Sequence, residues 1–228
     1  MSNLTNATLS VCIRFSFMIA LLAVLIAGPS RTAHADEIAI WNFNDSDVTV
    51  DHGAGSLLTT FPTVGFGAGT TVNARQGDPA LQALVLSGNA NNGQSITLNV
   101  STLGFGDLMV SFATQRTSTG FNNNQFQYSL DGITFLDFEA PYNPAAAFAL
   151  VVFDLSGIAG LNDNPNAAFR IVFNGATSSG GNNRLDNLVV EGSPIDNTAV
   201  PEPATLTLFG LGWTLLLGAR RIRKKRRL

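Results

Sequence analysis

Carboxylates are the residues of this chain whose spacing could support catalysis. Asp137 and Glu139 stand two residues apart, so on a strand they would lie on one face. Two carboxylates can hydrolyse a glycosidic bond when they lie about 5–10 Å apart across a cleft. Because Asp and Glu are mostly surface residues, an exposed hairpin edge is the favoured interpretation, and a secreted carboxylate-dependent hydrolase of polysaccharide is an alternative.

Groups for nucleophilic or zinc chemistry are scarce. The chain has one cysteine, Cys12, and two histidines, His34 and His52. Cys12 and His34 fall in a predicted N-terminal leader, so the mature protein would keep His52 as its single histidine and have no thiol. The G-x-S-x-G motif of a serine nucleophile is also missing from the sequence. We therefore expect that the protein is not an enzyme.

Hard oxygen ligands are more plentiful. Asp45, Asp47 and Asp51 cluster after the first expected strand, and the body is rich in Asn. Calcium takes six to eight oxygen ligands, so a structural calcium ion is the cofactor that this composition favours. The spacing of an EF-hand loop is missing, and the alternative is that these acids are solvated.

Aromatic side chains with an exposed face could bind a carbohydrate by stacking. Trp41 and Tyr142 are the candidate ligand-binding residues. Trp41 falls in the first expected strand, where packing in the core is an equally good interpretation. Tyr142, between Pro141 and Asn143, is expected to be exposed.

The candidate residues lie in or between short segments in which apolar and polar residues alternate, and Gly, Asn, Asp and Pro separate these segments. Asp131-Gly132 is expected to join two strands directly, and Gly65–Gly69 is expected to be a flexible loop. The pattern predicts an all-β body over residues 36–192, an antiparallel β-sandwich that is jelly-roll-like. The expected strands contain Ile38–Phe43, Ile96–Val100, Leu108–Phe112, Phe126–Leu130, Ile133–Phe138, Phe148–Phe153, Ala168–Phe173 and Leu185–Val190.

The N-terminal residues 1–35 have the organisation of a secretory signal peptide. An apolar run from Phe15 to Ala27 would form the signal helix. Ala33 and Ala35 then place small residues where signal peptidase reads the chain, with cleavage before Asp36. An uncleaved anchor is the alternative, which the shortness of the apolar run disfavours.

The C-terminal residues predict a membrane anchor. Ala204 to Ala219 carries no charge and would form a transmembrane helix slightly shorter than a typical hydrocarbon core. A polar linker, residues 193–199, separates this region from the body. The cations after the span place the tail in the cytoplasm and the body across the inner membrane. These cytoplasmic anchor residues are Arg220, Arg221, Arg223, Lys224, Lys225, Arg226 and Arg227.

The charge of the body restricts its partners. The whole chain has a formal charge of −3, but between Asp36 and Ala199 four Arg oppose 15 acids, which leaves −11. A surface of that sign repels phosphate, so we expect no nucleic-acid partner.

Residues 200–228 resemble the PEP-CTERM sorting signal of exopolysaccharide-producing Gram-negative bacteria. Val200-Pro201-Glu202-Pro203 is followed by a Leu- and Gly-rich span and then by the basic tail. The two prolines would hold the motif extended just outside the membrane. The resemblance implies recognition of the motif by an exosortase, a membrane cysteine protease. It further implies removal of the span and release or attachment of the body at the cell exterior.

The body resembles other exported proteins that carry this signal. The matching patterns include Gly120–Gly132, Asn164–Arg170 and Arg184–Val190. The last pattern is also similar to the closing strand of carbohydrate-binding jelly rolls. In many of those, an Asp of that strand and an acid near the first strand hold a structural calcium, and the matching positions here are Asp186 and Glu37.

These features together predict an exported protein that is held in the membrane and then sorted to the cell surface or extracellular matrix. Its partners would be signal peptidase, an exosortase, the membrane and an exopolysaccharide. The β-sandwich would act as a structural or carbohydrate-binding module. A matrix adhesin that works by protein contacts is a further alternative.

Overall fold

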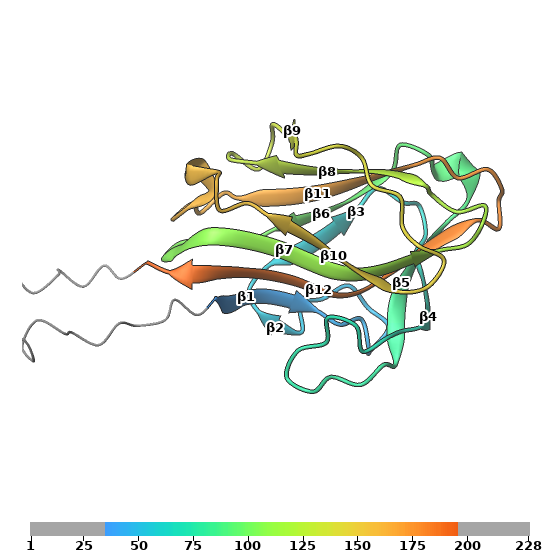
Figure 1. Cartoon of the computed structure of the whole chain (residues 1–228), viewed down its shortest axis with the longest axis horizontal. Coiled ribbons are helices and arrows are strands. Elements are labelled where there is room, and N and C mark those ends of the chain that lie inside the picture. The colour runs from blue at the N-terminus through green and yellow to red at the C-terminus, as the bar shows by residue number, and fades with distance from the viewer. Residues whose placement is uncertain (1–34, 196–228) are drawn as a thin grey trace, which may run out of the picture. The chain divides into compact units, whose positions relative to one another are not determined.

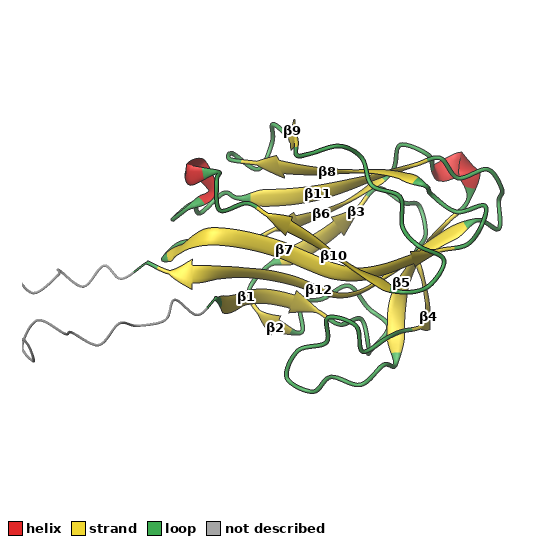
Figure 2. Cartoon of the chain, viewed as in Figure 1, coloured by secondary structure: helices red, strands yellow, loops and turns green. Residues whose placement is uncertain are grey.

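The computed structural model describes residues 35–195, which form two antiparallel β-sheets (Figure 1). Two short 3-10 turns, η1 (Asn89–Asn91) and η2 (Ala159–Leu161), are the helical segments in this range (Figure 2). Sheet A contains β1 (Asp36–Trp41), β2 (His52–Gly53), β4 (Gly65–Ala68), β5 (Gln82–Ser87), β7 (Phe105–Arg116), β10 (Ala149–Asp154) and β12 (Asn182–Pro194). Sheet B contains β3 (Ser56–Thr59), β6 (Ser95–Asn99), β8 (Asn123–Ser129), β9 (Leu136–Asp137) and β11 (Ala168–Asn174).

Strand β12 organises sheet A. It pairs with β7 on one edge, while its other edge pairs first with β5, over Asn182–Leu185, and then with β1, over Leu188–Gly192. The register with β7 shifts between Asp186 and Val189, and Asn187 between them has φ of 48°. This bulge bends the strand where its partner changes. At Asp186, sheet A therefore divides into a branch that continues through β5 and a branch that continues through β1.

Aromatic side chains hold the two sheets together. Phe126 of β8, in sheet B, stacks on Phe153 of β10, in sheet A, with ring centroids 4.0 Å apart and planes inclined by 13°. Phe126 also lies beside Phe169 of β11, and Phe153 packs against Phe112 of β7. All four rings belong to one buried cluster that spans both sheets. With one Cys in the chain, stability comes from this packing and not from internal disulfides.

The predicted all-β antiparallel sandwich is confirmed, with two local corrections. Strands β8 and β9 do form a hairpin, but their pairing starts at Tyr128 and Leu136, so a longer loop contains Asp131-Gly132. Asp131 organises that loop, since its carboxylate accepts N–H bonds from Ile133 (2.9 Å) and Thr134 (2.7 Å). The glycine-rich segment expected to be a loop is strand β4, paired with β5.

The predicted terminal helices lie outside the described residues. Between residues 35 and 195 no helix is long and apolar enough to cross a membrane. Strand β1 begins at Asp36, the residue before which signal peptidase is expected to cut, and Asp36 pairs with Gly192 near the end of β12. The described chain therefore starts and ends side by side at one end of the sandwich (Figure 1).

Candidate functional site

Of the two aromatic residues expected to bind a ligand, Trp41 is buried in the core and Tyr142 is partly buried against it. Trp41 is 0% exposed and belongs to the buried cluster between the sheets. Tyr142 packs its ring against Phe112 and Phe153, with centroids 6.1 and 5.8 Å away, and burial raises the pKa of its hydroxyl. Trp41 therefore has no free face for stacking on a sugar, which corrects that expectation, and Tyr142 is less exposed than expected because its ring packs against the core. The reason is that a sandwich without disulfides uses its large aromatics to fill the core.

Glu37 and Asp186, the expected calcium pair, lie far apart. Glu37 is opposite Glu191 on β12, five residues along the strand from Asp186, a separation of roughly 16 Å. Glu37 accepts a hydrogen bond from Gln76 (2.9 Å) and pairs with Arg75 (3.6 Å). No group of three His, Cys, Asp or Glu that could hold a metal occurs among residues 35–195. The arrangement does not fit a calcium ion shared by Glu37 and Asp186.

Asp186 instead fixes the β4–β5 loop to the outer face of sheet A. Its Oδ2 accepts the Thr70 N–H (2.6 Å) and its Oδ1 accepts the Asn187 N–H (2.9 Å). A Cβ at Gly69 would lie 2.5 Å from the same Oδ2, so only glycine allows this approach. The side chain is 1% exposed, and burial raises the pKa of Asp186 to about 7.

Asp137 and Glu139 are both exposed, at and just beyond the end of β9. They stand at one edge of sheet B, and Glu139 has a left-handed backbone with φ of 57°. Asp137 is engaged with Gln127, whose Nε2 donates to Asp137 Oδ1 (2.6 Å). This is the exposed hairpin edge that the sequence favoured.

A row of side chains crosses the outer face of sheet B. The strand registers place one residue from each strand side by side: Leu58 of β3, Thr97 of β6, Arg170 of β11, Gln127 of β8 and Asp137 of β9. We call these five residues the cross-strand row. Their neighbours along the strands, such as Phe126, Phe169 and Leu98, face the core. Four gaps of about 4.8 Å make the row roughly 19 Å long.

A hydrogen-bond relay orders the polar half of the row. Arg170 Nε donates to Gln127 Oε1 (2.7 Å), and Gln127 Nε2 donates to Asp137 Oδ1 (2.6 Å). The Arg170 guanidinium also lies 3.8 Å from the centroid of the Phe135 ring. Partial burial lowers the pKa of Arg170, and Asp137 opposes that effect. Arg170 keeps its charge because arginine titrates far above neutral pH.

The cross-strand row offers the chemistry that a polyhydroxylated ligand needs. Within residues 35–195, Arg170 hydrogen bonds through Nε, which leaves both Nη groups as donors. Asp137 Oδ2 remains an acceptor, and Thr97 carries a hydroxyl. Leu58, which is 57% exposed, adds an apolar patch at the far end. The relay fixes these groups before binding, so a ligand would not have to order them.

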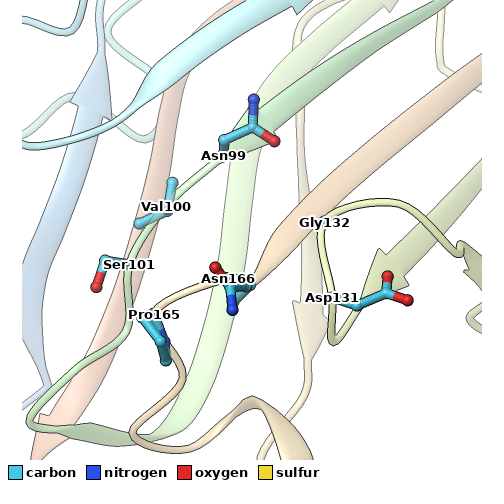
Figure 3. A pocket seen from close by; sticks show the side chains of 8 residues that line it. Asn99, Val100, Ser101, Asp131, Gly132, Pro165 and Asn166 are labelled. Atoms are coloured by element: carbon cyan, nitrogen blue, oxygen red, sulfur yellow. The ribbon is translucent and has the colours of Figure 1, made fainter.

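A hollow of about 250 Å³ lies at one end of this face, between the end of β6 and the β8–β9 loop. Asn99, Ser101, Asp131 and Asn166 contribute its polar lining. Figure 3 shows the Asp131 carboxylate directed away from Asn166, back into its own loop. Hydrogen bonds from the backbone of Thr134 and Ile133 lower the pKa of Asp131. Asp131 therefore stabilises its own loop, and the polar side chains that line the hollow do not point toward one common position.

Sequence reasoning missed the cross-strand row. The patterns Gly120–Gly132 and Asn164–Arg170 contain Gln127 and Arg170, but the pairing of β8 with β11 is what brings them together. The predicted sorting motif Val200–Pro203, the span, the tail and Ala33 all lie outside the described residues.

Comparison with known proteins identifies the C-terminal segment. The family model for the PEP-CTERM protein-sorting motif matches residues 199–225, so the chain carries this motif. It indicates an exported protein with a C-terminal sorting region. A search of curated protein sequences found no match.

Several solved structures are similar to the body. The CBM22-1 xylan-binding domain from Paenibacillus barcinonensis Xyn10C is 10% identical, covers 72% of this chain and 99% of that domain, and has a TM-score of 0.47. Domain 4 of AbnA, an arabinanase from Geobacillus stearothermophilus, is 13% identical, covers 71% of this chain and 94% of that domain, and has a TM-score of 0.42. TmCBM61 in complex with β-1,4-galactotriose is 15% identical, covers 65% of this chain and 92% of that chain, and has a TM-score of 0.41.

The raised pKa of Asp186 predicts how stability depends on pH. The folded carboxyl titrates near 7 and an unperturbed one at 3.8, so the folded state holds the proton while the unfolded state has lost it. The free energy of unfolding should therefore fall between about pH 4 and pH 8, by 1–4 kcal/mol at roughly 1.4 kcal/mol per pKa unit. Urea titrations of residues 36–195 with a chelator present, at pH 5 and pH 8, measure this difference.

Asp186→Asn should remove most of that difference, because the neutral amide does not titrate. Asp154→Asn is the control, since hydrogen bonds with Ser156 lower the pKa of Asp154 and move its effect below this pH window. A difference that is equally large in Asp186→Asn and in the unmodified protein would show that Asp186 is not its source.

Proposed function

We propose that this protein is an exported, non-enzymatic, polysaccharide-binding module that an exosortase sorts to the cell surface or extracellular matrix. The cross-strand row on sheet B is the observation that carries the binding part. In this proposal the sandwich is jelly-roll-like, residues 1–35 are a cleaved signal peptide, and residues 200–228 act as a temporary membrane anchor.

The motif match at residues 199–225 supports the sorting part. The sequence adds an apolar run that is followed by Ala33-His34-Ala35 near one terminus, and an uncharged span followed by a basic tail at the other. Residue Asp36, at the expected cleavage point, is the first residue of β1. Cleavage there would leave the sandwich whole.

The shape and chemistry of the sheet B face support the binding part. An extended glycan needs a long open surface with alternating donors and acceptors, and the row supplies both over roughly 19 Å. Arg170 and Gln127 are each half-buried, so their side chains are held in place while their outer atoms remain open. No covering segment is needed, because a polymer can lie along an open face and keep its ends free.

The same geometry disfavours the hydrolase alternative. A glycosidase places its two carboxylates on opposite sides of the scissile bond. Asp137 and Glu139 instead lie next to each other at one sheet edge, and Asp137 is engaged in the relay with Gln127. A matrix adhesin acting by protein contacts is the second candidate, because several large apolar side chains of residues 35–195 are exposed, among them Leu58, Leu81, Leu103 and Ile133.

Sorting predicts two cleavages in the exported protein. In cells with an active exosortase, mass spectrometry should find a mature chain that begins at Asp36 and ends close to Pro203. In cells without the exosortase, the N-terminus should be the same, but the C-terminal span and tail should remain. An unchanged C-terminus in both strains would contradict exosortase processing.

Glycan binding predicts a loss of affinity when the relay is cut. Arg170→Ala and Gln127→Ala should each weaken binding to the native exopolysaccharide by roughly fivefold or more, since a hydrogen bond is worth about 1 kcal/mol. Affinity electrophoresis through gels that contain the exopolysaccharide measures the change.

Leu150→Ala is the matched control, because Leu150 is 52% exposed on β10 of the other sheet. Its mobility in the gel should equal that of the unmodified protein. If all three variants bind equally well, the sheet B face is not the binding surface. If neither the unmodified protein nor any variant binds the exopolysaccharide, and matrix assembly still requires the protein, the adhesin alternative replaces the proposal.

A further inference from the structure

Three loops and the last described residue meet at one end of the sandwich. The β6–β7 loop (100–104), the β8–β9 loop (130–135) and the β10–β11 loop (155–167) all lie there, because β6, β8 and β10 end and β7 and β11 begin at this level. Phe105, at the start of β7, lies opposite Pro194, at the end of β12. Figure 1 shows these loops on the same side as the start of β1 and the end of β12. The chain therefore leaves the described body at this end.

Hydrogen bonds fix the loops to one another and to the chain end. Asn164 of the β10–β11 loop donates from Nδ2 to Leu130 O of the β8–β9 loop (3.0 Å), and its backbone N–H donates to Thr102 Oγ1 of the β6–β7 loop (3.1 Å). The Ile195 N–H donates to Gly104 O, also in the β6–β7 loop (2.7 Å). The loops thus form one surface whose parts hold each other in place.

Apolar side chains are exposed on this surface. Single exposed apolar residues are ordinary on a soluble protein, whereas a group of them in one place marks an interaction site. Of the nine large apolar side chains exposed in residues 35–195, four lie at this end, and Ile133 is the most exposed of all at 83%. Pro165 of the β10–β11 loop is exposed beside them. We call this set the apolar end: Leu103, Leu130, Ile133, Pro165 and Ile195.

The charge of the same surface restricts what can cover it. The three loops contain no Lys or Arg. Asp107, Asp131 and Asp163 are exposed in or next to them, and hydrogen bonds with the backbone of Thr134 and Ile133 lower the pKa of Asp131. An anionic polysaccharide or a nucleic acid would be repelled here. The partner of the apolar end must therefore accept apolar side chains and carry no net negative charge.

The sequence beyond Ile195 supplies a partner of that kind. The expected membrane span begins at Ala204, so eight residues separate it from the last described residue. Eight residues span at most roughly 30 Å even when fully extended. While the span is in the membrane, the apolar end cannot move farther than this from the bilayer. A short tether of this kind raises the effective concentration of a second contact to about the millimolar range, so that weak binding is enough.

We propose that the apolar end of the sandwich rests on the bilayer surface that the C-terminal span enters. Leu103 and Ile133, at the tips of two loops, enter the boundary between headgroups and acyl chains, where burial of apolar area stabilises the contact. The neighbouring carboxylates stay at the headgroup level and suit the ammonium groups of zwitterionic lipids.

This contact goes beyond the proposed function, because it gives the body itself a lipid-binding surface, and it rests on the membrane anchor of that function. It also orients the molecule. The strands would stand away from the membrane, and the cross-strand row, which runs across them, would lie parallel to the bilayer with its face open to a polymer.

The test is fluorescence quenching on the whole chain, purified from cells without the exosortase and reconstituted in phosphatidylcholine nanodiscs. Cys12→Ser removes the one native thiol, and Ile133→Cys or Ser179→Cys then carries an NBD fluorophore. Ser179 is exposed in the loop between β11 and β12, at the opposite end of the sandwich. Lipids with a doxyl quencher in the acyl chain should lower the emission of the Ile133 label at least twofold and leave that of the Ser179 label unchanged.

A matched pair of substitutions tests the apolar contact itself. Leu103→Glu should remove half or more of the quenching at Ile133, because a carboxylate resists transfer out of water. Leu81→Glu is the control, since Leu81 is 55% exposed, Leu103 is 54% exposed, and Leu81 lies in the β4–β5 loop beside Asn44, beyond the far end of β1. It should leave the quenching unchanged. Equal loss of quenching in both variants would overturn the proposal.

The same samples separate failure of the contact from failure of the anchor. A chain that stays with the discs but shows no quenching at Ile133 would overturn the contact alone. A chain that does not stay with the discs would overturn the anchor and the contact together. Shielding of the Ile133 label from an aqueous quencher by added exosortase, and not by lipid, would assign the apolar end to a protein partner and overturn the proposal as well.

Discussion

The alternation of side chains along strands packed against a second sheet is the constraint on which this structure depends. Phe126 and Phe169 point into the core, where Phe126 stacks on Phe153 of the opposite sheet. Because successive side chains point to opposite faces, Gln127 and Arg170 must point outward. The same packing that stabilises a body without internal disulfides therefore builds an ordered polar row on its outer surface. A shift of one residue in the register of β8 or β11 would bury these polar groups and lose both features.

The sequence predicted the parts of the fold that depend on local alternation. Segments such as Ile96–Val100 and Ala168–Phe173 were recognised because apolar residues recur at every second position. Strand β4 was missed because its sequence, Gly-Phe-Gly-Ala, has low strand propensity, and pairing with β5 makes it a strand. The Asp131-Gly132 turn was expected to be shorter than it is, because a side chain, Asp131, satisfies the backbone of a longer loop.

The candidate site could not be predicted in the same way, since it depends on contacts between distant parts of the chain. Arg170 and Gln127 are 43 positions apart and meet through strand pairing. The aromatic candidate Trp41 failed for a related reason, because residue type alone does not decide between filling a core and facing solvent. The resemblance matched Glu37 and Asp186 to one calcium site, but the strand register places Glu37 opposite Glu191, five residues along β12 from Asp186.

In the proposed function, sheet B and the C-terminal motif belong to an exported module whose open face binds a polysaccharide. The most direct test is NMR of the protein labelled with nitrogen-15, titrated with fragments of the native exopolysaccharide. The account predicts that the side-chain amide signal of Gln127 and the Nε–H signal of Arg170 shift first and saturate together, with backbone shifts along β6, β8 and β11. Shifts confined to other strands, or no shift at saturating polysaccharide, would contradict it.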